Sequence, residues 1–456
     1  MQKEKIVDNK TVTPSTKEKH YLTGKEIREI SKSNAKEMKY YERLKNRKCH
    51  ESEFLTEMKD SNNILEVEDL HSYFFTDQGV VKAVNGVSFS IPLNSTIGVV
   101  GESGCGKSIT AMSIMRLLQG PTGQIVNGNI RFKANDFKKD ASGNFIPLYE
   151  RDQNGNIVQE TVKDKKGNEI TIDKIKRDSN DFPLYEREEK TYDIAKMPIK
   201  EMYRLRGRQI AMVFQEPMTS LNPVFTIGNQ LDEVSLLHIP GATKELAKKR
   251  SLDMLNMVGI AMPERVYDAF PHELSGGMRQ RVMIAMALAA EPRLIIADEP
   301  TTALDVTIQA QILDLFNDLK KRINGSILLI THDLGVIAEM ADYVIVMYAG
   351  RVIEQGTVYE IYKNPCHPYT MGLQKSKPTM NTSKDDLFNI PGNVPNPINM
   401  PNYCYFKERC DKCIKKCNGD YPGMVQISPT HFVACHLYED YKRDQKLNEE
   451  GEENGK

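Results

Sequence analysis

The chain has 456 residues and a formal net charge of −1 at pH 7. That length allows two or three domains with a substantial hydrophobic core. The near-neutral charge argues against a whole-molecule attraction to nucleic acid or to a membrane surface. The sequence contains no uninterrupted apolar run long enough for a transmembrane helix and begins without a signal-peptide pattern, so we expect a protein that stays in the cytoplasm.

Residues 1–62 are rich in Lys, Glu, Ser, Thr and Asn and poor in large apolar side chains. This composition is typical of a charged tail, and we expect most of it to be disordered. Within it, Thr23-Gly24-Lys25-Glu26 has the pattern of a capping box and predicts a basic helix that runs to Lys48. A thin apolar stripe leaves open a helix on a membrane surface, but a solvated tail is the preferred interpretation. The stripe consists of Ile27, Ile30, Met38 and Tyr41.

The first ordered elements are expected after this tail. Residues 64–67 and 84–91 have the apolar pattern of strands, with a turn around Asp77-Gln78-Gly79 between them. Phe74, with Tyr73 beside it, falls upstream of the glycine-rich loop that follows. Its ring would stack on an adenine base if that loop binds a nucleotide, although an ordinary aromatic residue at a strand end fits the position as well.

Residues 101–108 read Gly-Glu-Ser-Gly-Cys-Gly-Lys-Ser and match the phosphate-loop pattern G-x-x-x-x-G-K-[ST]. A predicted buried strand precedes the loop and a predicted helix follows it. Glycines let the backbone turn tightly, so successive N–H groups and the positive end of the helix face a polyphosphate. Lys107 would reach the β- and γ-phosphates, and the hydroxyl of Ser108 would bind Mg²⁺. We expect the nucleotide to contact Gly101, Ser103, Gly104, Cys105, Gly106, Lys107, Ser108 and Ile109.

The composition changes in residues 134–196, which are polar and rich in turn-forming residues. Asn154-Gly155 and Lys166-Gly167-Asn168 are flanked by alternating residues, which indicates β-hairpins. A short internal repeat is present, because residues 145–151 (FIPLYER) resemble residues 182–187 (FPLYER). Two copies are too few for a solenoid. We interpret the stretch as a surface insertion with some hairpin structure.

Regular α/β texture then resumes. Three apolar runs have the character of buried strands, and each ends in polar residues: Gln215, Asp298-Glu299 and Thr331-His332. The segments between them have a helical pattern, and Leu274-Ser275-Gly276-Gly277 opens one of these helices. Strands that alternate with helices predict a mostly parallel sheet, and polar residues at the carboxyl ends of the strands predict a site along that edge.

These motifs, in this order, resemble one family, the ATP-binding-cassette (ABC) ATPases. Ala303-Leu304-Asp305 also follows at a suitable position. The Ser-Gly-Gly signature distinguishes this family from other phosphate-loop NTPases, and no guanine signature is present, so adenine is the expected base. The implied fold is α/β, with a mostly parallel sheet, an antiparallel β subdomain and a helical subdomain that carries the signature. The resemblance places this cassette at 63–360, a small Cys-rich C-terminal domain at 361–440 and a disordered tail at 441–456.

The resemblance also implies a role for each residue. Asp298 would hold Mg²⁺ through its water shell, with Ser108 and Gln215 as further ligands. Glu299 would act as the general base on the attacking water, and His332 and Gln215 would align it. Two cassettes pair head to tail in this family, so the signature would close over ATP held by the partner chain. The remaining positions implied to contact nucleotide are Ser275, Gly276, Gly277 and Asp305.

Further segments narrow the resemblance to the ATPase subunits of oligopeptide, dipeptide and nickel importers. They are residues 214–223, 274–288, 366–370 and 390–395. Residues 278–283 look like the first, D-type, of the two ATPases that such importers usually carry. The resemblance implies an ATPase bound peripherally to the cytoplasmic face of the cell membrane. Its implied partners are a second ATPase of the F-type, two transmembrane permease subunits and, through these, an extracellular peptide-binding protein; nucleic acid is not among them.

The sequence of the ATPase does not identify the transported cargo, because the ATPase does not contact the cargo. Oligopeptides are the preferred cargo, and dipeptides, nickel or another small solute are the alternatives. A soluble cassette ATPase that acts on ribosomes or DNA is an alternative of another class. Such proteins usually carry two cassettes in one chain, or a coiled coil or zinc module inside the cassette, and neither feature occurs here.

Five cysteines crowd the C-terminal part of the chain, from Cys404 to Cys435. Four thiolates around a tight loop can hold an iron–sulfur cluster or a tetrahedral zinc ion. The peptide-importer ATPases carry four cysteines in this region, some with a [4Fe-4S] cluster, and the matching residues are Cys404, Cys410, Cys417 and Cys435. A cluster is the preferred interpretation, with zinc or unmetallated thiols as alternatives, and Cys413 is extra. Cys105 is interpreted as a small filler in the phosphate loop.

Overall fold

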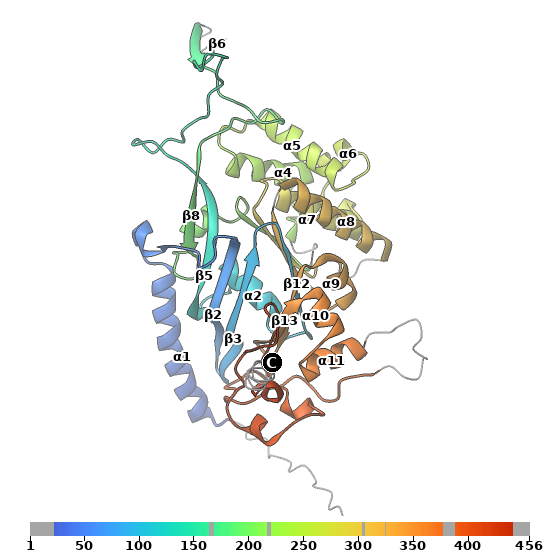
Figure 1. Ribbon diagram of the computed structural model, residues 1–456. Coiled ribbons are helices and arrows are strands. Elements are labelled where there is room, and N and C mark those ends of the chain that lie inside the picture. Colours follow the sequence, from blue (N-terminus) through green and yellow to red (C-terminus); the bar gives the residue numbers. More distant parts are fainter. Residues whose placement is uncertain are drawn as a thin grey trace, which may run out of the picture.

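The computed structural model describes residues 22–163, 168–216, 220–302, 306–323, 325–376 and 388–440. Asp305, the turn at Lys166-Gly167, residues 217–219 and the C-terminal tail at 441–456 lie outside the described residues. Two sheets form the body of the described chain, and a long insertion projects away from them (Figure 1).

The larger sheet has eight strands in the order β14-β15-β13-β12-β4-β11-β10-β9. The strands β12, β4, β11, β10 and β9 run parallel, which confirms the mostly parallel sheet that the sequence predicts. Every residue of β4, β10 and β11 is buried, as expected for strands covered on both faces. The bounds are β4 Thr96–Val100, β9 Ile210–Val213, β10 Leu294–Asp298, β11 Ser326–Ile330, β12 Tyr343–Tyr348, β13 Arg351–Thr357, β14 Val425–Gln426 and β15 Phe432–Val433.

Helices pack around this sheet, and α4 to α7 gather at the end of the molecule near the insertion (Figure 1). Among the described residues no helix combines the length and the apolar character needed to cross a bilayer. The helices on and around the sheet are α2 Lys107–Ile114, α4 Ile227–His238, α5 Lys244–Met257, α6 Pro263–Asp268, α7 Gly276–Leu288, α8 Val306–Ile323, α9 Leu334–Met340, α10 Val358–Lys363 and α11 Pro368–Lys375.

The smaller sheet is antiparallel, with the strand order β1-β8-β5-β2-β3. The chain enters the insertion after β5 and returns from it into β8. Phe74 lies in β2 opposite Val81 of β3, near the hairpin turn that joins the two strands. The bounds are β1 Leu55–Thr56, β2 Asn63–Thr76, β3 Gly79–Pro92, β5 Gly123–Phe137 and β8 Arg187–Asp193.

The expectation of a mostly disordered tail is wrong for the described residues 22–62. Helix α1, Gly24–Lys45, begins with the capping box that the sequence predicts. The N–H of Thr23 donates to the Glu26 carboxylate, and the N–H of Glu26 donates to the Thr23 hydroxyl. The helix lies along the antiparallel sheet rather than in solvent (Figure 1). Asn34 Nδ2 donates to Thr76 O at 2.7 Å, and the Tyr41 ring stacks on Phe75 with centroids 6.2 Å apart. These tertiary contacts order a segment whose composition alone favours disorder.

The insertion between β5 and β8 contains the expected hairpin, formed by β6, Gln159–Lys163, and β7, Glu169–Asp173. The two copies of the internal repeat pair with each other, because Pro147 and Tyr185 form an antiparallel bridge. Three sets of backbone hydrogen bonds each close a ring of three residues, so the segment is a chain of three-way strand junctions rather than a flat sheet. The rings join residues 138, 146 and 186, residues 148, 176 and 184, and residues 150, 158 and 174.

The C-terminal region, residues 361–440, which the sequence predicts to be a small Cys-rich domain, is joined closely to the cassette. Its strands β14 and β15 extend the large sheet of the cassette through β13. Several of its apolar side chains belong to the same buried core as the cassette helices: Ile361, Tyr369, Ile390, Met400, Tyr405 and Phe406. The region is therefore an extension of the cassette that shares its core.

Candidate nucleotide site

The phosphate loop connects β4 to α2 at the carboxyl edge of the large sheet. At two positions in this loop, close backbone contacts leave no room for a side chain, so glycine is required. At Gly101, with φ of 153°, an added Cβ would lie 2.3 Å from Met347 O, and at Gly106, with φ of 102°, it would lie 2.4 Å from Ala83 O. Helix α2 begins at Lys107, so the loop N–H groups and the helix N-terminus face the same space.

Lys107 and Ser108 lie at the base of this space. The Nζ of Lys107, which is buried, donates to Gly101 O at 2.8 Å and to Glu102 O at 3.2 Å. The hydroxyl of Ser108 donates to Asp298 Oδ1 at 3.0 Å. Burial raises the pKa of Asp298 and the charge of Glu299 adds to this, whereas the bond from Ser108 and the charge of Lys107 oppose it. Two oxygen atoms of the kind that bind Mg²⁺ are thus side by side in a site that favours a cation.

Glu299 is the centre of a second group of contacts. Its Oε2 accepts hydrogen bonds from Gln215 Nε2 at 3.0 Å and from Thr302 Oγ1 at 2.9 Å, and His332 Nδ1 lies 3.3 Å away. Three strands supply these residues, since Gln215 follows β9, Glu299 follows β10 and His332 follows β11. Thr302 was not predicted from the sequence, and its position three residues after Glu299 was the only signal that pointed to it.

A cleft of about 630 Å³ brings most of the predicted residues together. Gly101, Cys105 and Asp298 are close behind this lining, and Cys105 is fully buried, as expected for a small filler. Asp305 lies outside the described residues. The predicted residues that line the cleft are Phe74, Ser103, Gly104, Gly106, Lys107, Ser108, Ile109, Gln215, Glu299 and His332. The lining residues that sequence reasoning missed are Val81, Ala83, Ala349, Gly350, Pro395 and Pro397.

The signature residues lie apart from this cleft. Ser275 is the N-cap of α7, and its Oγ accepts from the N–H of Met278 at 3.3 Å. Gly276 is exposed, and an added Cβ there would meet nothing within 4 Å. Ser275, Gly276 and Gly277 are not part of the lining of the phosphate cleft of their own chain. Their contact with a nucleotide held by another chain stays a prediction.

The fold and this site define an ABC-type ATPase cassette. Residues 84–302 match the ABC transporter family, and residues 353–417 match the C-terminal region of oligopeptide/dipeptide transporters. The oligopeptide transport ATP-binding protein AppD of Bacillus subtilis is 42% identical over 384 residues, which are 84% of this chain and 99% of AppD. The chain therefore belongs to the ABC ATP-binding proteins of the oligopeptide and dipeptide transport family.

Two further relatives support this assignment. The oligopeptide transport ATP-binding protein OppD of Bacillus subtilis is 44% identical and covers 82% of this chain and 88% of OppD. The dipeptide transport ATP-binding protein DppD of the same organism is 41% identical and covers 82% of this chain and 94% of DppD. Because this chain spans nearly the whole of each relative, the match includes both the cassette and the C-terminal region.

The cysteines predicted to bind a metal lie near one another. Burial raises the pKa of Cys404 to about 12 and that of Cys435 to about 11, and neighbouring thiols, including that of Cys417, add to both shifts. Burial also raises the pKa of Cys410, again with Cys417 contributing. Within the described residues, no three of these thiols have their sulfur atoms all within 4.8 Å of one another.

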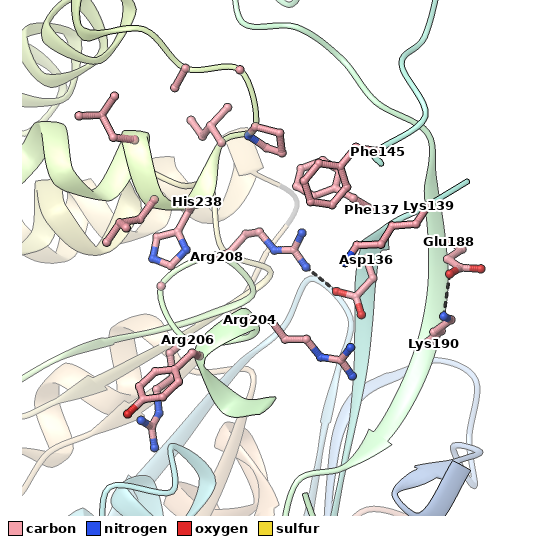
Figure 2. A pocket seen from close by; sticks show the side chains of 18 of the residues that line it. Asp136, Phe137, Lys139, Phe145, Glu188, Lys190, Arg204, Arg206, Arg208 and His238 are labelled. Carbon is pink, nitrogen blue, oxygen red and sulfur yellow. Dashed lines mark hydrogen bonds and ion pairs between the residues drawn. The ribbon is translucent and has the colours of Figure 1, made fainter. Parts of the chain in front are cut away.

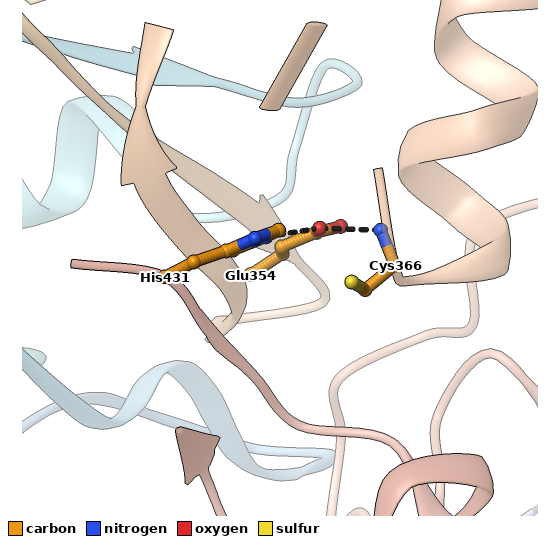
Figure 3. Close-up of side chains that lie close together, drawn as sticks. All are labelled: Glu354, Cys366 and His431. Carbon is orange, nitrogen blue, oxygen red and sulfur yellow. Dashed lines mark hydrogen bonds and ion pairs between the residues drawn. The ribbon is translucent and has the colours of Figure 1, made fainter. Parts of the chain in front are cut away.

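One set of potential ligands does meet that distance, namely Glu354, Cys366 and His431. Figure 3 shows the Glu354 carboxylate between the His431 ring and the backbone nitrogen of Cys366. The carboxylate accepts from His431 Nε2 at 2.8 Å and from the N–H groups of Cys366 at 2.6 Å and His367 at 2.9 Å. These bonds satisfy a fully buried acid and join β13 to α11 and β15, so we interpret the set as structural.

A larger cleft of about 1040 Å³ lies between the base of the insertion and the loop after α4 (Figure 2). Its cations face carboxylates: Arg208 pairs with Asp136, and Lys190 pairs with Glu188 at 2.7 Å. Arg208 also lies over the Phe137 ring, 4.7 Å from its centroid. The Arg208–Asp136 pair joins the base of the insertion to the segment before β9, whereas Glu188 and Lys190 pair within β8, and we assign no ligand to this cleft.

Proposed function

We propose that the chain hydrolyses ATP to drive the import of oligopeptides through a membrane permease. The observation that carries this proposal is the convergence of Gln215, Thr302 and His332 on Glu299, next to Lys107 and the Ser108–Asp298 pair. Phosphoryl transfer requires positioning and charge neutralisation more than covalent chemistry, and this arrangement supplies both. Membership of the oligopeptide and dipeptide transport family supports the cargo class.

Each residue has a step in the proposed mechanism. The phosphate-loop N–H groups and Lys107 would hold the β- and γ-phosphates, and Ser108 and Asp298 would hold the Mg²⁺ that neutralises them. Glu299 accepts the proton of the attacking water, while Gln215 and His332 orient its carboxylate. Mg²⁺, when bound, supplies charge stabilisation for the transferred phosphoryl group.

The proposed assembly contains a second cassette, of the F-type, two transmembrane permease subunits and an extracellular binding protein. The exposed signature supports pairing of two cassettes, because α7 offers the N-terminus of a helix to a phosphate outside its own cleft. Exposed apolar side chains near Gln215 and α4 support contact with a permease. They include Phe214, Val224, Phe225, Met262 and Phe270.

Substitution Glu299→Gln tests the catalytic proposal. The variant keeps the hydrogen-bonding shape of the side chain but not its basicity, so it should bind ATP and accumulate as an ATP-bound cassette pair with hydrolysis reduced by at least about a hundredfold. Size-exclusion chromatography with the second cassette and Mg·ATP, together with phosphate release, measures both effects. Lys107→Ala is the matched control that should bind no ATP and form no pair. Hydrolysis at the wild-type rate in Glu299→Gln would contradict the assignment.

The transport proposal has its own test. Affinity purification of the full chain from gently solubilised membranes, with partners identified by mass, should recover two multi-span permeases and a second cassette. The ligand of a co-purified binding protein would then distinguish oligopeptides from dipeptides, nickel or another solute. Recovery with ribosomes or DNA and without a permease would leave the ATPase chemistry intact and contradict transport.

We also propose that Cys404, Cys410, Cys417 and Cys435 hold a [4Fe-4S] cluster. A single zinc ion with Zn–S bonds of about 2.3 Å brings its thiolates to within roughly 4 Å of one another, which is closer than any three of these thiols lie. A [4Fe-4S] cluster binds each of its four thiolates to a different iron atom, and the four cysteines that match the family pattern would supply one thiolate each. Bound metal would keep Cys404 and Cys435 deprotonated despite the raised pKa values of these two thiols.

Anaerobic purification followed by iron, acid-labile sulfide and zinc analysis tests this proposal. The expected result is about four irons and four sulfides per chain, lost in Cys417→Ser and retained in Cys49→Ser, which changes a cysteine outside the group. One zinc per chain, or no metal, would contradict the cluster.

A further inference from the structure

The C-terminal region contacts the phosphate loop directly, and a single side chain makes most of this contact. The guanidinium of Arg409 forms a two-pronged ion pair with Glu102, with Nη1–Oε2 at 2.7 Å and Nη2–Oε1 at 3.0 Å. Glu102 is the second residue of the phosphate loop, and 307 positions separate the two residues in the chain. The Arg409 side chain is only 6% exposed and that of Glu102 is 27% exposed, so solvent weakens this pair little.

The remaining donors of Arg409 are also used. Its Nε donates to Pro391 O at 3.0 Å, its Nη1 to the Tyr348 hydroxyl at 3.4 Å and its Nη2 to Ile390 O at 3.3 Å. The guanidinium is thus fixed in orientation by β12 and by the segment that follows α11. The bond with Glu102 raises the pKa of Arg409, so the side chain stays charged. Because these hydrogen bonds fix the guanidinium, they also fix where the Glu102 carboxylate can pair with it.

A second contact holds the backbone of the same loop residue. The N–H of Glu102 donates to the hydroxyl of Tyr369, on α11, at 2.8 Å. Tyr369 is fully buried and packs with Tyr348 and Phe406, with ring centroids 4.8 and 5.5 Å apart. Glu102 is therefore held by both its side chain and its backbone, and both holds come from the C-terminal region.

These contacts lead to the phosphate-binding lysine. The carbonyl oxygens of Gly101 and Glu102 accept the hydrogen bonds of Lys107 Nζ. A displacement of Glu102 would move the peptide groups that set the position of the ammonium group. We propose that the C-terminal region clamps the phosphate loop, with Arg409 as a positioning residue that acts through Glu102 on Lys107. The inference rests on the proposed nucleotide site and adds to it a role for the C-terminal region.

The test measures nucleotide affinity rather than turnover, in the full chain, with Mg·ADP and a non-hydrolysable ATP analogue in titration calorimetry. Arg409→Gln and Glu102→Gln should each weaken binding by about tenfold, within the usual range for coupled sites. The double variant should bind about as weakly as either single variant, because both changes break one contact. Arg409→Lys should fall between wild type and Arg409→Gln, since lysine keeps the charge without the fork.

Arg250 provides the matched control. It is also 6% exposed and pairs with a glutamate, with Nη2 at 2.8 Å from Glu291 Oε1, but it lies in α5, away from the phosphate loop. Arg250→Gln should lower the midpoint of thermal unfolding and leave the dissociation constants within about twofold of wild type.

Several results would overturn the clamp. They are unchanged affinity in folded Arg409→Gln, an equal loss in Arg250→Gln, or a double variant that loses the product of the single effects. If Arg409→Gln does not fold, Arg409→Lys and Glu102→Gln are compared with wild type in the same way, and unchanged affinity in both overturns it. A wild-type chain that binds no nucleotide would instead contradict the proposed function, so the two failures are distinguishable.

Discussion

Glu299 has a rare backbone conformation, and its side chain contacts several neighbouring residues. Its φ is 47°, in the left-handed region, where a residue with a Cβ is strained by roughly 1–2 kcal/mol. Its N–H donates to Ile330 O at 2.8 Å, which ties it to β11. This conformation turns the chain sharply after β10, so Asp298 faces Ser108 while Glu299 faces Gln215 and His332. Two adjacent acids can thereby take two different roles.

His367 makes folding sensitive to acid. It is 2% exposed, its Nδ1 accepts from the N–H of Tyr369 at 3.0 Å, and burial lowers its pKa to about 4. The unfolded chain binds the proton near pH 6.5, before the folded chain does. The stability contribution is therefore complete above pH 6.5, falls as pH decreases from 6.5 to 4, and amounts to about 3 kcal/mol in total.

Urea unfolding between pH 7.5 and 4.5 measures this effect. In His367→Asn, whose side-chain oxygen can still accept the same N–H, the fall in unfolding free energy with acid should be smaller than in wild type. His272→Asn, at an exposed position, is the control and should follow the wild-type curve. Equal slopes in His367→Asn and wild type would show that His367 is not the responsible group.

At the scale of elements, α1 is attached to the antiparallel sheet by one face. Two adjacent tyrosines distinguish the contribution of the tertiary contact from that of helix formation. Tyr41 stacks on Phe75, whereas Tyr40 is 49% exposed. We expect Tyr41→Ala to lower the unfolding free energy by about 1–2 kcal/mol and Tyr40→Ala by less than about 0.5 kcal/mol. Chemical denaturation of the full chain measures both. Equal effects would mean that α1 contributes only through its own helicity.

The two ends of the insertion lie side by side. The N–H of Lys138 donates to Glu186 O at 2.9 Å, so a two-residue Asn-Gly turn can replace residues 139–185. None of the described residues in that segment lines the 630 Å³ cleft. The shortened chain should therefore fold and bind Mg·ADP within about twofold of the wild-type affinity in calorimetric titration. A large loss of affinity in a folded variant would assign the insertion a part in nucleotide binding.

At the scale of the whole molecule, Gln215 lines the nucleotide cleft, and the proposed permease surface includes the neighbouring Phe214. Phe225, which belongs to this surface, is 52% exposed, and Tyr359, on α10, is 69% exposed elsewhere. Phe225→Ser should reduce recovery of permease in affinity purification by at least about fivefold without weakening Mg·ADP binding, because it removes apolar area from a contact that excludes water. Tyr359→Ser is the matched control. Full recovery of permease with Phe225→Ser would place the contact on another surface.

Local patterns in the sequence were sufficient for the cassette itself. The phosphate loop, the acids after β10 and the signature each depend on a few consecutive residues, because backbone geometry and strand ends impose them locally. The buried strands and the capping box of α1 were predictable for the same reason. Asp298 and Glu299 could be paired with Ser108 and His332 because parallel strands bring their carboxyl ends to one edge.

Contacts between distant segments were decided only by the tertiary structure. The order of α1 depends on Phe75 and Thr76, and the pairing of the two repeat copies depends on strands that meet across the insertion. Several buried apolar side chains of the described C-terminal region pack in the core of the cassette, and its Arg409 bonds to a loop residue 307 positions away. By itself the sequence determined which residues to expect at the site, since most of them lie in short motifs. The structure determined what holds the site, since packing joins residues that no local pattern relates.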